Sequence, residues 1–128
     1  MDSKTEVREF TRAHVKIEAR VASGNAIVIF GQTRDISLNG LYVICDERLP
    51  PGTSCRLTLF LGESENQLTI RARGRITRLD DSGMGIEITE IPVESLDHMR
   101  RLVLYNSGGD SKAIEQEFET HVGIQRRK

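Results

Sequence analysis

Hydrophobic and polar residues alternate over residues 13–21, at the start of a long patterned region. The apolar positions are Ala13, Val15, Ile17, Ala19 and Val21, and the positions between them are His14, Lys16, Glu18 and Arg20. A period of two places successive side chains on opposite faces of an extended chain, so one face should be buried and the other should meet water. The pattern therefore predicts a β-strand over residues 13–21.

Further segments of extended character follow, separated by turn-forming residues. They cover residues 26–36, 41–45, 55–61, 67–78 and 85–89. The breaks between them contain SGN at 23–25, DERLPPG at 46–52, GESEN at 62–66 and DDSG at 80–83. Glycine, proline, asparagine and aspartate favour turns because of their backbone preferences and short polar side chains. We therefore expect six short strands, with Asp80 and Asp81 in a hairpin turn.

The segment 67–78 has the longest strict alternation in the chain. Its inward face is predicted to consist of Leu68, Ile70, Ala72, Gly74 and Ile76. Its outer face is predicted to carry Thr69, Arg71, Arg73, Arg75 and Thr77. A row of arginines on one strand face most often lies in solvent, where it discourages pairing with other sheets. A second interpretation places Arg75 beside a ligand pocket.

After Pro92 the pattern changes to a helical period. An apolar stripe formed by Leu96, Met99 and Val103, with Leu102 beside them, predicts an amphipathic helix over residues 93–105. The sequence NSGG at 106–109 is expected to end it. Residues 113–118 form a weaker amphipathic segment, which predicts at most a short helix in the tail.

Six short strands followed by a helix predict an all-β fold, a small six-stranded antiparallel barrel with a C-terminal helix. Closure of the sheet removes exposed strand edges. A barrel this narrow needs a plug at its open end, and the helix is the natural one. We expect a mobile leader at residues 1–12, the barrel and helix at 13–106, and a tail at 107–128.

Composition and charge narrow the possible functions. The 128 residues carry a net charge of −1, which argues against a protein that binds duplex nucleic acid through a global positive field. The two cysteines and three histidines show no metal-ligand spacing, so the thiols are expected to pack as small apolar groups. No apolar segment approaches a membrane span or a signal peptide core. We expect no membrane insertion, and the cytoplasm as the location.

A polar cluster interrupts the second predicted strand at TRDISLNGLYV, residues 33–43. Asp35, Ser37 and Gly40 follow a D-x-S-x-x-G spacing. One interpretation is a turn, in which the polar side chains bond nearby backbone and Gly40 supplies a positive φ. The other is one half of a ligand site on the barrel.

The other half would come from the leader, where Arg8 and Arg12 form an R-x-x-x-R pattern. Two arginines at this spacing can also be a solvated pair on a helical turn. Their position directly before the first predicted strand, together with the D-x-S-x-x-G cluster, favours a shared role. Together, in this order around two predicted strands, the two patterns are hard to assign to chance.

This combination resembles the PilZ domain family, whose members bind the bacterial second messenger cyclic di-GMP. The resemblance spans about residues 6–105 and rests on REFTR at 8–12, DISLNG at 35–40 and GMGIEI at 83–88. It implies a six-stranded barrel with a C-terminal helix. It also implies a ligand held between the leader arginines, Arg8 and Arg12, and the barrel residues Asp35, Ser37 and Gly40.

These residue types suit such a ligand on chemical grounds. A guanidinium fork can meet the paired O6 and N7 acceptors of guanine, and it can also stack on a purine face. The carboxylate of Asp35 can accept the N–H donors of the opposite guanine edge. Ser37 can reach a phosphate or the base, and Gly40 would allow close approach of the backbone.

The sequence therefore favours a single-domain cyclic di-GMP receptor without catalytic activity or resident cofactor. Ligand binding would order the leader, change the surface and signal to a downstream protein. An alternative is a PilZ-like module that acts by protein contacts alone. A single-stranded nucleic-acid binder would want aromatic platforms, and the chain has no Trp, two Tyr and four Phe. No catalytic motif supports an enzyme.

Overall fold

The computed structural model describes residues 13–24, 27–62, 68–107 and 125–127. The leader with Arg8 and Arg12 and the weak amphipathic segment at 113–118 lie outside the described residues. The elements in chain order are β1 (Glu18–Ser23), β2 (Ile27–Ile36), β3 (Gly40–Ile44), β4 (Ser54–Leu61), β5 (Leu68–Leu79), β6 (Gly83–Pro92), α1 (Val93–Ser107) and β7 (Gln125–Arg127).

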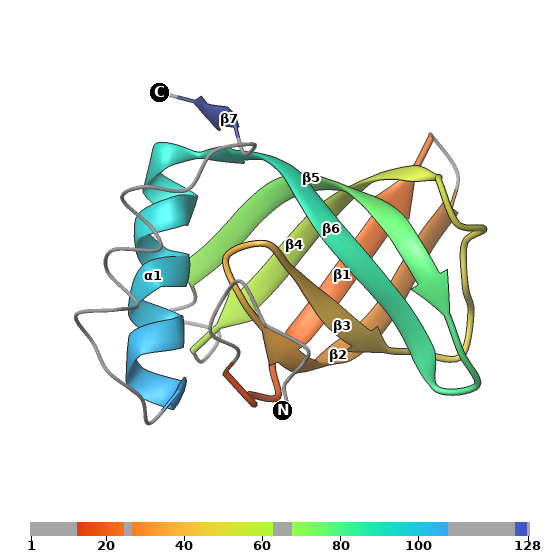
Figure 1. Ribbon diagram of the computed structural model, residues 1–128, viewed down its shortest axis with the longest axis horizontal. Coiled ribbons are helices and arrows are strands. Elements are labelled where there is room, and N and C mark those ends of the chain that lie inside the picture. Colours follow the sequence, from red (N-terminus) through yellow and green to blue (C-terminus); the bar gives the residue numbers. More distant parts are fainter. Residues whose placement is uncertain (1–12, 25–26, 63–67, 108–124, 128) are drawn as a thin grey trace, which may run out of the picture.

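The first six strands form a closed antiparallel barrel (Figure 1). Neighbouring strands follow the order β3-β2-β1-β4-β5-β6, and β3 pairs with β6 to close the sheet. Every pair within this ring is antiparallel. Closure leaves the ring without free edges along the paired strands. The predicted six-stranded barrel with a C-terminal helix is confirmed.

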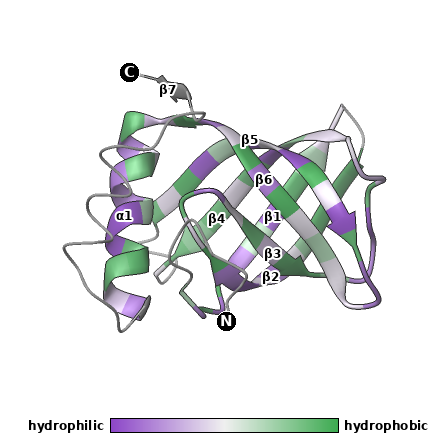
Figure 2. Cartoon of the chain, viewed as in Figure 1, coloured by the Kyte–Doolittle hydropathy of each residue, from purple (hydrophilic) through white to green (hydrophobic). Residues whose placement is uncertain are grey.

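The interior of the barrel is lined by the alternate apolar positions of the strands, which appear as bands of different hydropathy in Figure 2. In β5 the predicted inward positions Ile70, Ala72 and Ile76 are buried in the core cluster. Leu68 is an exception, with 53% of its surface exposed. It pairs with Leu61 at the start of β5, at the rim of the barrel beyond the filled interior.

The first strand begins later than the alternation predicts. β1 starts at Glu18, and residues 14–17 have no regular secondary structure. Ala13 forms an isolated antiparallel bridge with Ile36, and both residues are completely buried. The segment therefore runs beside β2 with Ala13 and Ile17 buried and Val15 partly buried, but it does not continue the ladder of β1.

Thr33 of β2 holds this irregular segment in place. Its hydroxyl accepts a hydrogen bond from the Ile17 N–H at 2.9 Å and donates one to the Val15 carbonyl at 2.6 Å. A side chain thus satisfies backbone groups that a regular strand pair would satisfy by itself. Because Thr33 is completely buried, these bonds lie away from water.

The helix α1 stands beside β5 and β6 at one end of the barrel (Figure 1). Met99 and Val103 are completely buried and join the barrel core, as the apolar stripe predicts. Leu96 is only partly buried, and Ser95 occupies the buried position one turn before Met99. The Ser95 hydroxyl accepts a hydrogen bond from the Arg71 N–H at 3.0 Å, which connects α1 to β5.

A short strand near the C-terminus was not predicted. β7 pairs in parallel with Glu90–Pro92 of β6. β3 pairs with β6 only as far as Glu87, so this side of the later residues of β6 is open to another strand. Backbone hydrogen bonds alone can hold an added strand there, and such bonds leave no hydrophobic pattern in the sequence.

Cys45 and Cys55 are free thiols, and both are buried, as expected for small apolar groups. Burial raises the pKa of the Cys55 thiol to about 11. The pKa of Cys45 is also raised, with burial as the first cause. Within the described parts of the chain, no helix is long and apolar enough to cross a membrane.

Candidate functional site

A β-bulge in β2 brings Asp35 to the outer face of the barrel. Thr33 pairs with Val43, a core residue, whereas Asp35 pairs with Tyr42, which lies outside the core cluster. The register between β2 and β3 shifts at this point, and Ile36 then returns to the core. Without the bulge, the period of two would direct Asp35 to the same side as Thr33.

The Asp35 carboxylate is well covered although it lies on the outer face. The residue is 4% exposed, and its Oδ2 forms an ion pair with Nε of Arg34 at 3.0 Å. Half of the Arg34 side chain remains exposed. The bulge therefore presents an acid and a base side by side, with the acid as the deeper of the two.

Tyr42 lies next to Asp35 and forms the centre of the cluster. Its ring is covered by the guanidinium of Arg34, with Cζ 3.9 Å from the ring centroid. The Cζ atom of Arg78 lies 5.8 Å from the same centroid. These distances place both cations within the range of cation–π attraction. Although it faces outward, Tyr42 is 1% exposed.

A second bulge, in β5, directs Arg78 to this ring. The register between β5 and β6 shifts between Ile76, which is in the core, and Arg78, which pairs with Gly85. A Cβ atom on Gly85 would meet Cγ of Arg78 at 2.9 Å. Glycine at position 85 therefore leaves the space that the Arg78 side chain occupies between its own strand and Tyr42.

Asp80 connects the cluster to the β5–β6 turn. Its Oδ1 accepts the N–H groups of Ser82 at 2.9 Å and Gly83 at 3.0 Å, as expected for a hairpin turn, and it also accepts the hydroxyl of Tyr42. The bond from Tyr42, followed by that from the Ser82 N–H, lowers the pKa of Asp80. Burial first, and then Asp80, raise the pKa of Tyr42.

Ser37 and Gly40 form the β2–β3 turn, so the turn interpretation describes the bonds they make. Both the N–H and the hydroxyl of Ser37 donate to the Gly40 carbonyl, at 2.8 Å and 3.2 Å. The expectation of a positive φ at Gly40 is wrong. A Cβ at position 40 would instead overlap the backbone oxygen of Ile86, so Gly40 allows β6 to approach.

A pocket of about 170 Å³ lies between this turn and the Tyr42 cluster. Gly40 contributes to one side of it, and Arg78 and Gly85 contribute to the other. Arg75 does not line this pocket. Its guanidinium pairs with Glu87 at 2.8 Å, on an exposed part of the outer face. Glu87 lines the pocket, so Arg75 reaches its border through this ion pair, whereas Arg78 lines it directly.

The sequence-predicted residues are only partly united within the described chain. Asp35, Ser37 and Gly40 lie along one hairpin, while Arg8 and Arg12 fall outside the described residues. Arg34, Tyr42, Arg78 and Asp80 were not predicted from the sequence as members of this cluster. Arg34 could have been noticed as the neighbour of Asp35, but nothing in the pattern indicates the two bulges that bring these side chains together.

The cluster offers a defined set of chemical groups. It has two guanidinium planes, one covered carboxylate and a tight turn whose backbone lies beside a small pocket. Guanidinium planes can stack on aromatic rings or bind phosphate, and a carboxylate accepts N–H donors. Among the described residues, no group of three or more His, Cys, Asp or Glu side chains could hold a metal ion.

The chain is similar to a known protein family and to solved structures of the same fold. Residues 6–105 match the family model of the PilZ domain, and this range includes both the leader arginines and the barrel cluster. No curated protein sequence matches the chain.

Two solved structures are similar in fold. An inhibitor of motility from Bacillus subtilis (MotI/DgrA) has a TM-score of 0.63 and 18% identity, over 94% of this chain and 58% of that one. The PilZ domain of CeSA from a cellulose-synthesizing bacterium has a TM-score of 0.54 and 22% identity, over 73% of this chain and 95% of that one. The chain thus spans little more than half the length of the motility inhibitor. From the extent of the match to the family model, the chain belongs to the PilZ domain family.

Proposed function

We propose that this protein is a cyclic di-GMP receptor, a binding module without catalytic activity that signals to a protein partner. The family supports a binding role, because cyclic di-GMP recognition is typical of PilZ domains. The proposed ligand has two phosphodiesters and two guanines. It therefore needs cations for its charge and a carboxylate for the N–H edge of a base.

The observation that carries the proposal is the position of Asp35. A bulge turns this carboxylate to the outer face of the barrel at the D-x-S-x-x-G motif, where it is nearly covered and paired with Arg34. The bulge keeps this acid out of the core, returns Ile36 to it and leaves the carboxylate beside a cation on the outer face. Bulges of this kind are common next to functional sites, where they redirect a side chain.

Arg34 and Arg78 extend the proposed site beyond the motif residues. Both guanidinium groups lie over the Tyr42 ring, which holds them against the barrel. Because the two side chains are already held in place, they lose less conformational entropy when a ligand binds. A guanine or a phosphate that approaches Asp35 would then meet cations already placed nearby. We propose that these two arginines contact the ligand, in addition to Asp35.

The leader supplies the second half of the proposed site. Arg8 and Arg12 would bind the ligand from the side opposite Asp35, and closing of the leader would change the surface offered to a partner. Ser37 and Gly40 are proposed to contribute through the shape of their turn, since the Ser37 hydroxyl already bonds the Gly40 carbonyl.

Isothermal titration calorimetry of the purified protein with cyclic di-GMP tests this function. We expect saturable binding heat, and in parallel NMR spectra we expect shifts of the amides of Asp35, Tyr42 and Arg78. GTP and cyclic di-AMP serve as matched nucleotide controls. A folded protein that gives no heat with tens of micromolar cyclic di-GMP would refute the receptor and favour a PilZ-like module that acts by protein contacts alone.

A further inference from the structure

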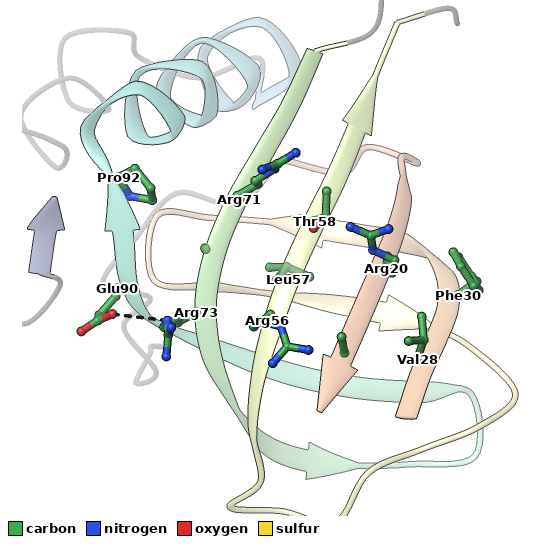
Figure 3. A pocket seen from close by; sticks show the side chains of 12 residues that line it. Arg20, Val28, Phe30, Arg56, Leu57, Thr58, Arg71, Arg73, Glu90 and Pro92 are labelled. Carbon is green, nitrogen blue, oxygen red and sulfur yellow. Dashed lines mark ion pairs between the residues drawn. The ribbon is translucent and has the colours of Figure 1, made fainter. Parts of the chain in front are cut away.

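A basic groove lies on the outer face of β1, β4 and β5 (Figure 3). Its volume is about 560 Å³, which is within the range of ligand pockets. Four arginines from three strands line it, namely Arg20, Arg56, Arg71 and Arg73. None of these side chains has a role in the site described above.

The register of the strands explains why this face is hollow. One row across the sheet runs Phe30, Arg20, Thr58 and Arg71, and the next row runs Val28, Ala22, Arg56 and Arg73. The inner positions Thr58 and Ala22 are short side chains, and both are buried. Long side chains around short ones on a twisted sheet produce a groove with a shallow floor and arginines along its sides.

The charge of the groove is only partly balanced. Arg56 and Arg73 are direct cross-strand partners on the same face, an arrangement in which like charges repel. Arg56 donates to the Gly24 carbonyl at 2.9 Å, and Arg73 lies 3.8 Å from a carboxylate oxygen of Glu90. Within the part of the chain that the structure describes, Glu90 is the acidic residue that lines the groove, so four cations share it with one anion. The chain as a whole has a net charge of −1.

An apolar edge borders the basic groove on β2. Phe30 is 69% exposed and Val28 is 45% exposed, although both are large apolar side chains. They contribute to the same groove as the arginines. Arginine together with an exposed aromatic side chain is the composition that protein interfaces concentrate at their centres.

We propose that this groove binds an acidic segment of a partner protein, with apolar side chains of that segment on Phe30 and Val28. The two arginine rows are two residues apart along each strand, which corresponds to about 7 Å. Carboxylates at alternate positions of an extended segment, or one helical turn apart, have a similar spacing. The partner's carboxylates would separate Arg56 from Arg73 and so remove the repulsion between them.

A protein segment fits this surface better than a nucleic acid. A polyanion would need a continuous positive track, but Glu18, Glu87 and Glu90 lie on the strands around or within the groove. Among the described residues, Phe30 is the single aromatic side chain lining the groove, so these residues offer successive bases no series of stacking platforms. The docking surface does not depend on cyclic di-GMP binding, although a receptor would need such a surface for its partner.

The test uses the full chain labelled with ¹⁵N and a synthetic 12-residue peptide in which Glu and Asp flank two Phe residues. We expect saturable NMR shifts of amides around Arg20, Thr58 and Arg71. A peptide with Gln and Asn in place of the acids should bind at least about tenfold more weakly. The double variant Arg56→Gln/Arg73→Gln should lose about tenfold in affinity, while Arg75→Gln, an exposed arginine of the same strand outside the groove, should bind normally.

Circular dichroism of each variant checks the fold. We expect the fold to be retained, because all three arginines are exposed. Equal binding of the neutral peptide, or full binding by the double variant, would overturn the proposal. So would tighter binding of a dT oligonucleotide at the same amides, which would assign the groove to nucleic acid. Shifts of these amides on dilution without peptide, or nuclear Overhauser contacts from Phe118, would assign it instead to a second copy or to the chain's own tail.

Discussion

The guanidinium of Arg34 lies 3.9 Å from the ring centroid of Tyr42, while its Nε is paired with Asp35, its neighbour in the chain. One arginine thus links the acid of the motif to the aromatic ring beside it. Arg78 reaches the same ring from β5. The geometry depends on two bulges, one in β2 and one in β5, which turn these side chains to the outer face.

Substitution Asp35→Asn should weaken cyclic di-GMP binding at least about tenfold, because it removes the charged acceptor and frees Arg34 from its ion pair. Calorimetry with the purified variant measures the change. Asp46→Asn, at an exposed loop residue, should bind as the parent protein does. If the two variants bound cyclic di-GMP with equal affinity, Asp35 would not be part of the binding site.

Arg78→Ala should also weaken cyclic di-GMP binding, and Arg75→Ala should weaken it less. Arg78 lies at the Tyr42 ring and lines the pocket near Gly40. Arg75 does not line that pocket and is joined to it through its ion pair with Glu87, a lining residue. We expect a loss of about tenfold for the first variant. A stronger effect at position 75 would show that the ligand lies farther along β5 than we propose.

Thr33→Val should destabilise the fold by about 2–4 kcal/mol. Valine has nearly the same side-chain shape as threonine but no hydroxyl. The Ile17 N–H and the Val15 carbonyl would therefore lose their hydrogen-bond partner at a buried position. Thr33→Ser retains the hydroxyl and should recover most of this loss. Urea unfolding followed by circular dichroism gives both values, and equal stabilities of the two variants would contradict the assigned role of the hydroxyl.

Gly40→Ala should cost about 3 kcal/mol of stability, because the new Cβ would overlap the backbone oxygen of Ile86 and push β3 from β6. Gly24→Asn is the control, since position 24 is open and its φ of 62° suits asparagine. Thermal unfolding compares them. If Gly40→Ala were as stable as the parent, the close approach of the two strands would not explain this glycine.

The phenol of Tyr42 should titrate above its ordinary pKa of 10.0, owing first to burial and then to the bond with Asp80. Because the folded pKa is raised, the associated stability is complete below the ordinary value and is lost as the pH rises through the folded one. Phenolate absorbance in a Tyr105→Phe background reports Tyr42 alone. Asp80→Asn should lower the Tyr42 pKa, and no change would argue against the bond.

Asp80 gives the opposite pH dependence. Its pKa is lowered, first by the hydrogen bond from Tyr42. Its contribution to stability should therefore be present above the ordinary carboxyl pKa and be lost as the pH falls through the folded value. Tyr42→Phe removes the donor, so the acid limb of a stability profile should move to higher pH in that variant. An unchanged acid limb would show that Tyr42 does not set this pKa.

Local patterns in the sequence were sufficient for most of the fold. Alternation in β4 and β5, turn residues such as Gly24 and Gly52, and the stripe of Met99 and Val103 depend on neighbours in the chain, so they can be read without knowing the partners. The same reading failed where backbone pairing dominates. β7 adds to an open edge of β6 by main-chain bonds, and residues 14–17 leave the ladder because Thr33 satisfies their backbone.

Periodicity and turn chemistry are local properties of the chain, so they were enough to predict the all-β barrel, its helix and the motif that contains Asp35. Which side chains surround that motif depends on how distant strands pair. Bulges in two strands far apart in the chain reverse the facing of Arg78 and Asp35, and register places Tyr42 between them. A shift of one residue in pairing exchanges the two faces of a strand, and the register depends on all the partners of that strand at once.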